Sequence, residues 1–345
     1  MAHIVLADDG IEFDGESPAK GPLGGVESSI VNLTRALAVR GHDVSVYNMC
    51  SASKVIEGVS WSPLFNGLPE TADLYIANRG DKLLPLMPAA GRTVFWIHNP
   101  AQYLLKWRYL SKLWRLKPAI IFIGNYHAST YPVWAPGGQR VVIPYGISDD
   151  FRNVPEAGSP PPARAIFTSN PLRSLDWLLD VWASRIHPQA PRAELHIFSG
   201  AMTYGRVGAS KSADMQVVLD RARLLSEQGV VLRRPVPKQD LIAEFGKARV
   251  MMYKGDENET FCLAVGEAQA AGVPAVVQRY GSVVERVKDG QTGVIADNDT
   301  EFTEAAVALL KDDRCWRECH INAQRLQRSW GWADAARAFE ELLPL

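Results

Sequence analysis

Short apolar runs alternate with helical patterns along the 345-residue chain, and this alternation constrains the possible fold most strongly. Each run is too short for a buried helix and is typical of a strand that is buried on both faces of a parallel sheet. A helix is predicted at residues 28–40, with Ile30 and Leu33 on one face and Gly41 at its end. The predicted strands are residues 3–7, 44–47, 74–77, 93–97, 119–123, 165–168, 194–198, 230–232, 249–253 and 275–277. The pattern predicts an α/β protein built from doubly wound parallel sheets.

A proline-rich stretch divides the predicted strands into two series. Residues 153–163 contain Pro160, Pro161 and Pro162 and show no apolar period, as expected of a linker. A chain of this length usually forms two domains. We predict an N-terminal domain at residues 1–152 and a C-terminal domain at residues 164–328, joined by this linker.

The composition excludes several classes of protein. The net charge of −1 provides no general attraction for nucleic acid. The first residues enter a strand directly, so we expect no signal segment, and no apolar run reaches the length that spans a bilayer. The spacing of the cysteines is not that of a metal site, and we expect thiols in a reducing cytosol and neither a bound metal nor a cofactor. These cysteines are Cys50, Cys262, Cys315 and Cys319.

Two carboxylates eight residues apart point to a ligand. Glu259 and Glu267 flank the start of a predicted helix that ends at Gly272, between the strands at 249–253 and 275–277. Eight residues are close to two helical turns, so both side chains can face one side. A carboxylate accepts two hydrogen bonds from a diol, and a helix N-terminus suits a phosphate. The unit predicts a nucleotide-sugar site, whereas the alternative is an amphipathic helix with two surface glutamates.

The string Glu259-Thr260-Phe261-Cys262-Leu263, followed by Glu267, resembles the retaining glycosyltransferases of family 4 and their Glu-x7-Glu motif. The resemblance covers nearly the whole chain. It implies the GT-B architecture, in which two Rossmann-like domains face a cleft, the N-terminal domain lies on the acceptor side, and the C-terminal helix at residues 329–345 crosses back to it.

The resemblance also implies roles for these residues. Glu259 is expected to bind hydroxyls of the donor sugar and Glu267 to bind the ribose. The backbone N–H groups of Thr260, Phe261, Cys262 and Leu263 are expected to face the diphosphate.

Other positions of the family pattern lie on loops that follow strands. Gly24 and Gly25 precede the first long helix and are expected near the diphosphate. His98 follows the strand at 93–97 and is expected near the sugar, although a lone histidine is more often structural. Gly200 and Val236 are expected to contact the nucleotide through their backbones.

The family usually places two cations on the diphosphate. Arg173 matches the second, and the alternative for it is a solvated arginine at a helix start. The position of the first cation holds Thr168 and Ser169 instead, so either Lys254 or Arg206 replaces that cation or hydroxyls suffice.

Residues 103–117 contain five cations, four aromatic residues and no acid. As one helix they would place Tyr103, Trp107, Leu110 and Trp114 on one stripe and Arg108, Lys112 and Arg115 on another. Such a segment suits an anionic membrane surface or a phosphorylated acceptor, and the alternative is a helix that packs its aromatic stripe into the core.

The resemblance implies a retaining glycosyltransferase of polysaccharide biosynthesis. No carboxylate pair with the spacing Asp-x-Asp follows the expected strand, so we expect catalysis to be independent of a metal. The enzyme would move a sugar from a UDP- or GDP-linked donor to a hydroxyl of a saccharide or lipid-linked glycan, in the cytoplasm or at the inner face of the membrane. The alternatives are another GT-B enzyme, of epimerase or phosphorylase type, and a catalytically weak nucleotide-sugar-binding protein.

Overall fold

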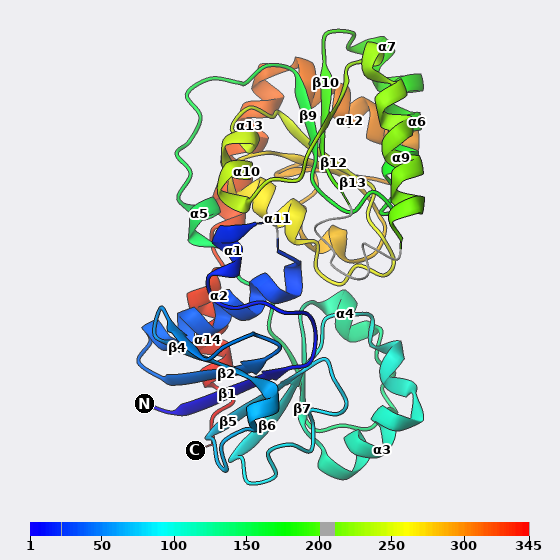
Figure 1. The fold of residues 1–345 in the computed structure, drawn as a ribbon. Coiled ribbons are helices and arrows are strands. Elements are labelled where there is room, and N and C mark those ends of the chain that lie inside the picture. The colour runs from blue at the N-terminus through cyan, green and yellow to red at the C-terminus, as the bar shows by residue number, and fades with distance from the viewer. Residues whose placement is uncertain (22, 201–210, 345) are drawn as a thin grey trace. The chain divides into compact units, whose positions relative to one another are not determined.

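The computed structural model describes residues 1–21, 23–200 and 211–344, which form two compact units. The first unit contains Met1–Lys20, Gly25–Gly146 and the residues from Trp330 onward, and the second contains Gly21–Gly24 and Ile147–Ser329. Each unit is built around one sheet with helices beside it (Figure 1).

The sheet of the first unit has the strand order β3-β4-β2-β1-β5-β6-β7-β8. Neighbouring strands are parallel except β3 and β4, which form an antiparallel pair at one edge. Every residue of β5 and of β7 is buried, as expected of strands covered on both faces. The strands are β1 (His3–Asp8), β2 (Asp43–Asn48), β3 (Lys54–Ile56), β4 (Val59–Pro63), β5 (Leu74–Asn78), β6 (Arg92–Trp96), β7 (Ala119–Phe122) and β8 (Arg140–Val142).

The helices of the first unit pack through the faces that their sequences make apolar. Helix α2 (Gly25–Val39) buries Ile30 and Leu33, the face predicted from the sequence, and α14 (Trp332–Glu340) packs beside α2. Phe339 of α14 meets Trp96 of β6 edge-on, with 5.4 Å between the ring centroids. The last helix is therefore part of the core of this unit. The other helices are α1 (Ser17–Lys20), α3 (Trp107–Leu116) and α4 (Asn125–Ser129).

The sheet of the second unit has the strand order β11-β10-β9-β12-β13-β14, and all its pairs are parallel. Its strands are β9 (Arg164–Phe167), β10 (Glu194–Phe198), β11 (Val230–Arg233), β12 (Val250–Tyr253), β13 (Ala275–Gln278) and β14 (Gly293–Ala296). Its helices are α5 (Asp149–Arg152), α6 (Leu175–Val181), α7 (His187–Gln189), α9 (Ser212–Leu224), α10 (Lys238–Phe245), α11 (Leu263–Ala270), α12 (Asp299–Lys311) and α13 (Asp313–Gln327).

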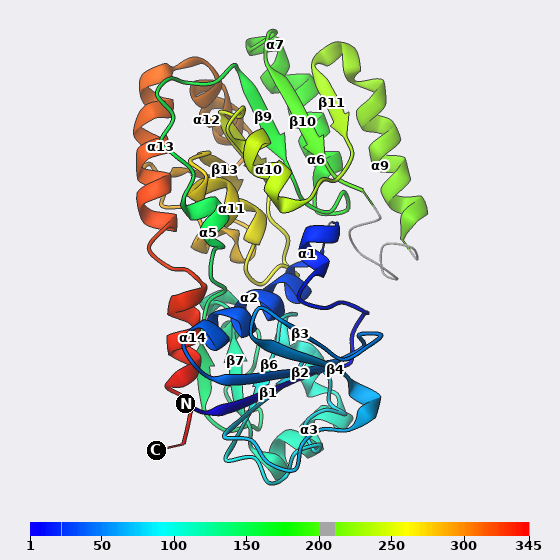
Figure 2. The same cartoon turned by 60° about the vertical axis from the view of Figure 1, so that its left-hand side comes forward.

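Each sheet has one point at which the strand order reverses. In the first unit β2 and β4 lie on one side of β1, whereas β5 to β8 lie on the other. In the second unit β10 and β11 lie on one side of β9, where Figure 2 shows them next to each other, whereas β12 to β14 lie on the other. Ligands of open parallel sheets bind beyond the carboxyl ends of the strands at such a switch point. The loops after β1 and β5, and those after β9 and β12, are thus the first places to look for a site.

All ten predicted strands are present, and the predicted α/β class with two doubly wound parallel sheets is confirmed. The sequence pattern does not predict β3, β4, β8 or β14. In β4 buried and half-buried residues alternate, and β3 and β8 are short and mostly exposed. None of these three forms the continuous apolar run that marks a fully covered parallel strand, whereas β14 (Gly293–Ala296) is apolar and was not predicted.

Candidate functional site

The switch point of the second unit holds an arginine–glutamate pair. Arg173 lies between β9 and α6, and Glu259 lies between β12 and α11. The Nη1–H of Arg173 donates to Oε1 of Glu259, and the whole Glu259 residue is only 5% exposed. Its second oxygen, Oε2, is buried and has no hydrogen-bond partner among the described residues. A buried acceptor without a partner at this position marks Glu259 as a candidate ligand contact.

The two members of this pair differ in their access to solvent. The Arg173 side chain is 37% exposed, whereas that of Glu259 is 7% exposed. Burial opposes the charge of Arg173, but the Glu259 carboxylate outweighs it, so the pKa of the guanidinium is raised. The sequence assigned Glu259 to the sugar and Arg173 to the diphosphate. The structure brings the two side chains together, so a ligand of either group must compete with this pair.

A second pair lies further along α11. Glu267 is buried, and Lys238 at the start of α10 donates to its Oε1. The Lys238 ammonium also lies 6.0 Å from the centre of the Phe151 ring. Lys238 was not predicted from the sequence, where only backbone contacts were expected from the loop that precedes α10.

The residues before α11 form a constrained turn. Thr260, Phe261 and Cys262 are buried, and Leu263 is the first residue of the helix. Cys262 has a positive φ of 61°, an unusual backbone for a residue with a side chain. The guanidinium of Arg286 stacks on the Phe261 ring at 4.1 Å, and burial lowers the pKa of Arg286. A cation that the sequence analysis did not identify therefore contacts the turn at the start of α11.

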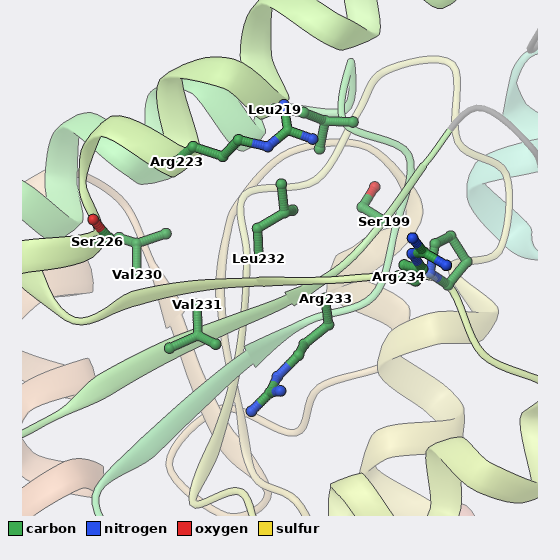
Figure 3. Close-up of a pocket in the computed structure, with 10 residues that line it drawn as sticks. Ser199, Leu219, Arg223, Ser226, Val230, Val231, Leu232, Arg233 and Arg234 are labelled. Carbon is green, nitrogen blue, oxygen red and sulfur yellow. The ribbon is translucent and has the colours of Figure 1, made fainter.

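Gly200 and Val236 follow β10 and β11, where the sequence analysis placed nucleotide contacts. A Cβ at Gly200 would lie 3.0 Å from Pro235, so the two loops touch there. The neighbouring residues Ser199 and Pro235 line a pocket of about 600 Å³ along the edge strand β11. In Figure 3 Val230 and Leu232 point to one side of β11 and Val231 and Arg233 to the other.

A smaller pocket, of about 440 Å³, is lined by Val236 together with Asp240 and Glu244 of α10. Arg173, Glu259 and Glu267 line neither of these two pockets. The two pockets therefore do not coincide with the charged side chains at the switch point.

The two candidates for the missing first cation differ. The Lys254 ammonium lies over the Trp177 ring at 4.9 Å and 6.0 Å from the centre of the Tyr280 ring. Arg206 lies outside the described residues. No carboxylate of the described residues pairs with the Lys254 ammonium, and the two aromatic rings hold its charge.

Gly25 is the first residue of α2 and Gly24, which is grouped with the second unit, directly precedes it, as the sequence predicted for a helix start. His98 follows β6, is buried, and has both ring nitrogens engaged. Nε2 lies 2.5 Å from Oδ1 of Asn78, and Nδ1 lies 2.5 Å from the hydroxyl of Tyr145. The predicted contact of His98 with a sugar would require one of these bonds to be exchanged.

The hydrogen bonds around His98 assign its tautomer. The amide nitrogen of Asn78 donates to Oδ1 of Asp8 at 2.6 Å, which leaves Oδ1 of Asn78 to accept from His98. Nε2 of His98 therefore carries the proton, and Nδ1 accepts from Tyr145. Burial, and then the charge of Arg79, lower the pKa of His98 well below its ordinary value, in agreement with a neutral ring.

Arg79 completes this network and was missed by the sequence analysis. Its Nε and Nη2 donate to the two oxygens of Asp8, at 3.0 and 3.2 Å, and Nη2 also donates to Glu27 at 3.0 Å. Asp8 is fully buried and Glu27 nearly so. The sequence offered one clue, because Asp8 and Asn78 are polar residues at the ends of apolar strands that pair with each other.

The segment at 103–117 is not one helix. A 3-10 turn (Ala101–Leu105) ends at Lys106, and α3 begins at Trp107. Trp107 and Trp114 are 80% and 72% exposed, so the alternative in which these two tryptophans pack into the core does not hold. Tyr109 and Leu113 are buried in their place. The break at Lys106 shifts the helical phase and turns the two tryptophans outward.

The cations of α3 fall into two groups. Lys112 donates to Oδ2 of Asp81 at 2.6 Å, and Arg108 lies 3.5 Å from the same carboxylate. Asp81 lies in another loop. The sequence of residues 103–117, which contains no acid, therefore does not show that two of its cations are paired with a carboxylate. The remaining cations are exposed and lie outside these ion pairs; they are Lys106, Arg115 and Lys117.

In residues 1–21, 23–200 and 211–344, no group of three or more histidine, cysteine or acidic side chains is arranged to hold a metal ion. Over the same ranges no helix combines the length and apolar character needed to cross a membrane. The four cysteines are free thiols.

Comparison with protein families supports a transferase domain in the second unit. Residues 165–312 match the family described as glycosyl transferases group 1. The D-inositol 3-phosphate glycosyltransferase of Corynebacterium diphtheriae is 30% identical over 143 residues, or 41% of this chain and 33% of that protein. The protein of the same name from Thermobispora bispora is 27% identical over 219 residues, or 60% of this chain and 50% of that protein. The chain thus spans about a third to a half of these relatives.

Solved structures resemble the chain over nearly its whole length. Sucrose-phosphate synthase from Thermosynechococcus elongatus has a TM-score of 0.71 at 16% identity and covers 98% of this chain and 97% of its own. Anabaena HepE, solved with UDP and glucose, has a TM-score of 0.68 at 14% identity and covers 99% of both chains. Similarity at such identity shows the fold, which is the predicted GT-B fold. The chain therefore has the GT-B fold, and residues 165–312 of its second unit match the glycosyl transferases group 1 family.

Proposed function

We propose that the protein is a retaining glycosyltransferase of family 4, which transfers a sugar from a UDP- or GDP-linked donor to a hydroxyl of a saccharide or lipid-linked glycan. One observation carries the proposal. Glu259 is a buried carboxylate at the switch point of the second unit, with one oxygen paired to Arg173 and the other without a partner among the described residues. The group 1 domain match surrounds both residues, and a structural relative was solved with UDP and glucose.

In the proposed reaction the bond between the anomeric carbon and the diphosphate oxygen breaks. The acceptor oxygen bonds to the same carbon on the same face, and its proton leaves with the diphosphate. Arg173 and the N–H groups at the start of α11 stabilise the charge that develops on the diphosphate. When Arg173 turns to the diphosphate, both oxygens of Glu259 become available to the sugar hydroxyls.

The remaining residues bind the donor in this proposal. Glu267 accepts hydrogen bonds from the ribose after exchanging its Lys238 partner. Gly24 and Gly25 allow close approach to the diphosphate, and the loops at Gly200 and Val236 contact the base through their backbones. His98 contacts the sugar only after giving up Asn78 or Tyr145, so it is the least supported of these assignments.

The chemistry proposed here uses fixed protein charges in place of a metal. The supporting observation is the set of cations near α11, in which Arg173 pairs with Glu259 and Arg286 stacks on Phe261. We expect transfer to continue in excess chelator, measured as nucleoside diphosphate release. A requirement for magnesium or manganese would contradict this part of the proposal.

The test of the function is donor hydrolysis. The full chain is incubated with several UDP- and GDP-sugars, and release of free sugar and nucleoside diphosphate is followed. We expect slow hydrolysis of one donor, and loss of hydrolysis in Glu259→Gln but not in Glu304→Gln, an exposed carboxylate of α12 that serves as the matched control. An epimerase would convert the donor without freeing the sugar, a phosphorylase would require phosphate, and a binding protein would bind without turnover.

We also propose that α3 attaches the protein reversibly to an anionic membrane surface, such as the inner face of the cytoplasmic membrane. Trp107 and Trp114 are exposed, and they are seven residues apart on α3, so they share one side of the helix. Aromatic rings with nearby cations suit a membrane interface, where each cation contributes about 1 kcal/mol. Since Arg108 and Lys112 already pair with Asp81, the attraction must come mainly from the exposed cations Lys106, Arg115 and Lys117.

Vesicle sedimentation tests this attachment. Changing Lys106, Arg115 and Lys117 to serine should lower binding to anionic vesicles at low salt, with no effect on neutral vesicles. The control changes three exposed cations of the second unit, Arg192, Lys288 and Arg325, to serine and should bind as wild type does. If wild-type protein does not sediment with anionic vesicles, the attachment is refuted and a phosphorylated acceptor becomes the candidate ligand of α3.

A further inference from the structure

An exposed turn of the first unit has apolar residues at its tip. The amide of Ala135 donates to the carbonyl of Pro132 at 3.1 Å, so Val133 and Trp134 are the two central residues of a β-turn. Val133 is 95% exposed and Trp134 is 73% exposed. Glycine, asparagine, aspartate and serine are the usual residues at such positions. The fold gains little from an exposed valine and tryptophan there, which indicates that they contact something outside the chain.

Arg140 holds the backbone of this turn in place. Its Nη2 donates to the carbonyls of Pro132, Val133 and Ala135 at 2.8, 3.1 and 2.8 Å, respectively. The guanidinium also lies over the ring of Tyr131, which is buried, at 4.7 Å. A carbonyl without a partner is costly when it leaves water for an apolar medium. Three carbonyls of the turn are already paired, so its tip can leave water without that cost for them.

The turn lies beside the segment that contains α3. The amide of Ala101, at the start of the 3-10 turn before α3, donates to Oγ1 of Thr130 at 2.7 Å. After α3, the carbonyl of Pro118 accepts from the amide of Gly138 at 2.9 Å. Residues 130–138 are thus bonded to the chain on both sides of α3. The turn and the exposed tryptophans of α3 therefore belong to the same part of the first unit.

Positive charge is concentrated in the same part of the chain. Residues 82–148 contain eight of the 37 Lys and Arg residues and none of the 38 Asp and Glu residues. The eight cations are Lys82, Arg92, Lys106, Arg108, Lys112, Arg115, Lys117 and Arg140. Among the described residues, Asp81 is the only acid that forms an ion pair with any of them, and it pairs with Arg108 and Lys112. An anionic partner would therefore meet an excess of positive charge here.

We propose that the β-turn at residues 132–135 inserts its tip, Val133 and Trp134, into an anionic lipid bilayer. The inference rests on the membrane attachment proposed above for α3, and it adds the element that enters the apolar layer. A lipid surface satisfies both chemistries at once, because its headgroups attract the cations and its acyl chains accept the apolar tip.

Vesicle sedimentation of the full chain at low and at moderate salt tests the insertion. With vesicles of phosphatidylglycerol and phosphatidylcholine, Trp134→Ser should bind about tenfold more weakly than wild type, and Val133→Ser about threefold more weakly. The loss in Trp134→Ser should be the same at both salt concentrations, because burial of apolar surface is not screened. The loss caused by changing Lys106, Arg115 and Lys117 to serine should instead shrink as salt is added.

Phe65→Ser is the matched control, because Phe65 is 83% exposed in a different turn of the first unit. It should bind the vesicles as wild type does, and an unchanged midpoint of thermal unfolding shows that each variant is folded. Wild-type binding by Trp134→Ser, or an equal loss in Phe65→Ser, would overturn the insertion and leave the attachment through α3 in place. A wild type that binds no anionic vesicle would refute the attachment itself, and the insertion with it.

Discussion

The two switch points place charged side chains at equivalent positions of similar sheets, but they pair them differently. At the second, Arg173 pairs with Glu259 and Lys238 with Glu267, and neither cation has another ion pair among residues 1–21, 23–200 and 211–344. At the first, one guanidinium is shared by Asp8 and Glu27, and Asp8 also anchors Asn78, whose amide holds His98. One arrangement consists of separable pairs and the other of a connected network.

Separate ion pairs and a connected network differ in how readily their side chains can exchange partners with a ligand. In a separate pair the cation is partly exposed and can turn to a ligand, and it remains hydrated while it does so. In the network, removing one member leaves several buried polar groups without partners, which is costly. We infer that the second switch point is suited to exchanging partners with a charged donor, and that the first is suited to holding a fixed geometry.

The largest expected contrast is in stability. Asp8→Ala leaves Arg79 with one carboxylate and Asn78 without its acceptor, and breaking a buried ion pair costs about 3–5 kcal/mol. Glu259→Ala leaves only Arg173, which is partly exposed, and should cost less than about 1 kcal/mol. Thermal unfolding followed by calorimetry measures both, and equal midpoints for the two variants would erase the distinction between network and pair.

Glu259→Ala, which should cost little stability, should nearly abolish transfer. Loss of a charged hydrogen bond to a sugar hydroxyl costs about 1.5–3 kcal/mol, equal to roughly 10- to 150-fold, and more where the bond strengthens in the transition state. Rates of nucleoside diphosphate release at saturating donor provide the measurement. Near wild-type turnover in a folded variant would remove Glu259 from the donor site.

The pH dependence of stability probes the buried rings of the first unit. Burial lowers the pKa of His127 to about 4, and it also lowers that of His98. An unfolded histidine has a pKa of about 6.5, so protons favour the unfolded state and stability falls as the pH falls below about 6.5. For His127 the loss between pH 7 and 5 is about 2 kcal/mol.

The measurement is the unfolding midpoint of wild type and His127→Gln at both pH values. Glutamine does not titrate, so this variant should lose less between pH 7 and 5 than wild type does. An equal loss in both proteins would show that His127 does not remain neutral in the folded state.

The smallest expected effect is on nucleotide affinity. Glu267→Ala should weaken binding of the nucleoside diphosphate about tenfold, because the hydrogen bonds to the ribose are lost. The ribose does not change charge during the reaction, so the effect should fall on binding. Lys238→Ala leaves the carboxylate in place and frees it from its internal partner, so affinity should stay the same or rise. Titration calorimetry compares the two, and a larger loss for Lys238→Ala would show that the lysine itself binds the nucleotide.

The sequence located most of the second switch point but little of the first. Glu259 and Glu267 lie close together on one segment, so their spacing is readable in the chain, and the group 1 domain match covers the same region. The Asp8–Asn78–Arg79 network joins residues about 70 positions apart, and nothing local marks them as neighbours. Only the parallel pairing of β1 with β5 puts them at the same edge.

The sequence by itself determined the fold class, since short runs of apolar residues can be buried only as strands covered on both faces. It also determined that two carboxylates stand near the start of α11. The tertiary structure decided which charges neutralise which, because an ion pair depends on distance in space and not on separation along the chain. For that reason Lys238, Arg286 and Arg79 became visible only in the folded protein, and Trp107 and Trp114 were shown to face solvent only once the break at Lys106 set the phase of α3.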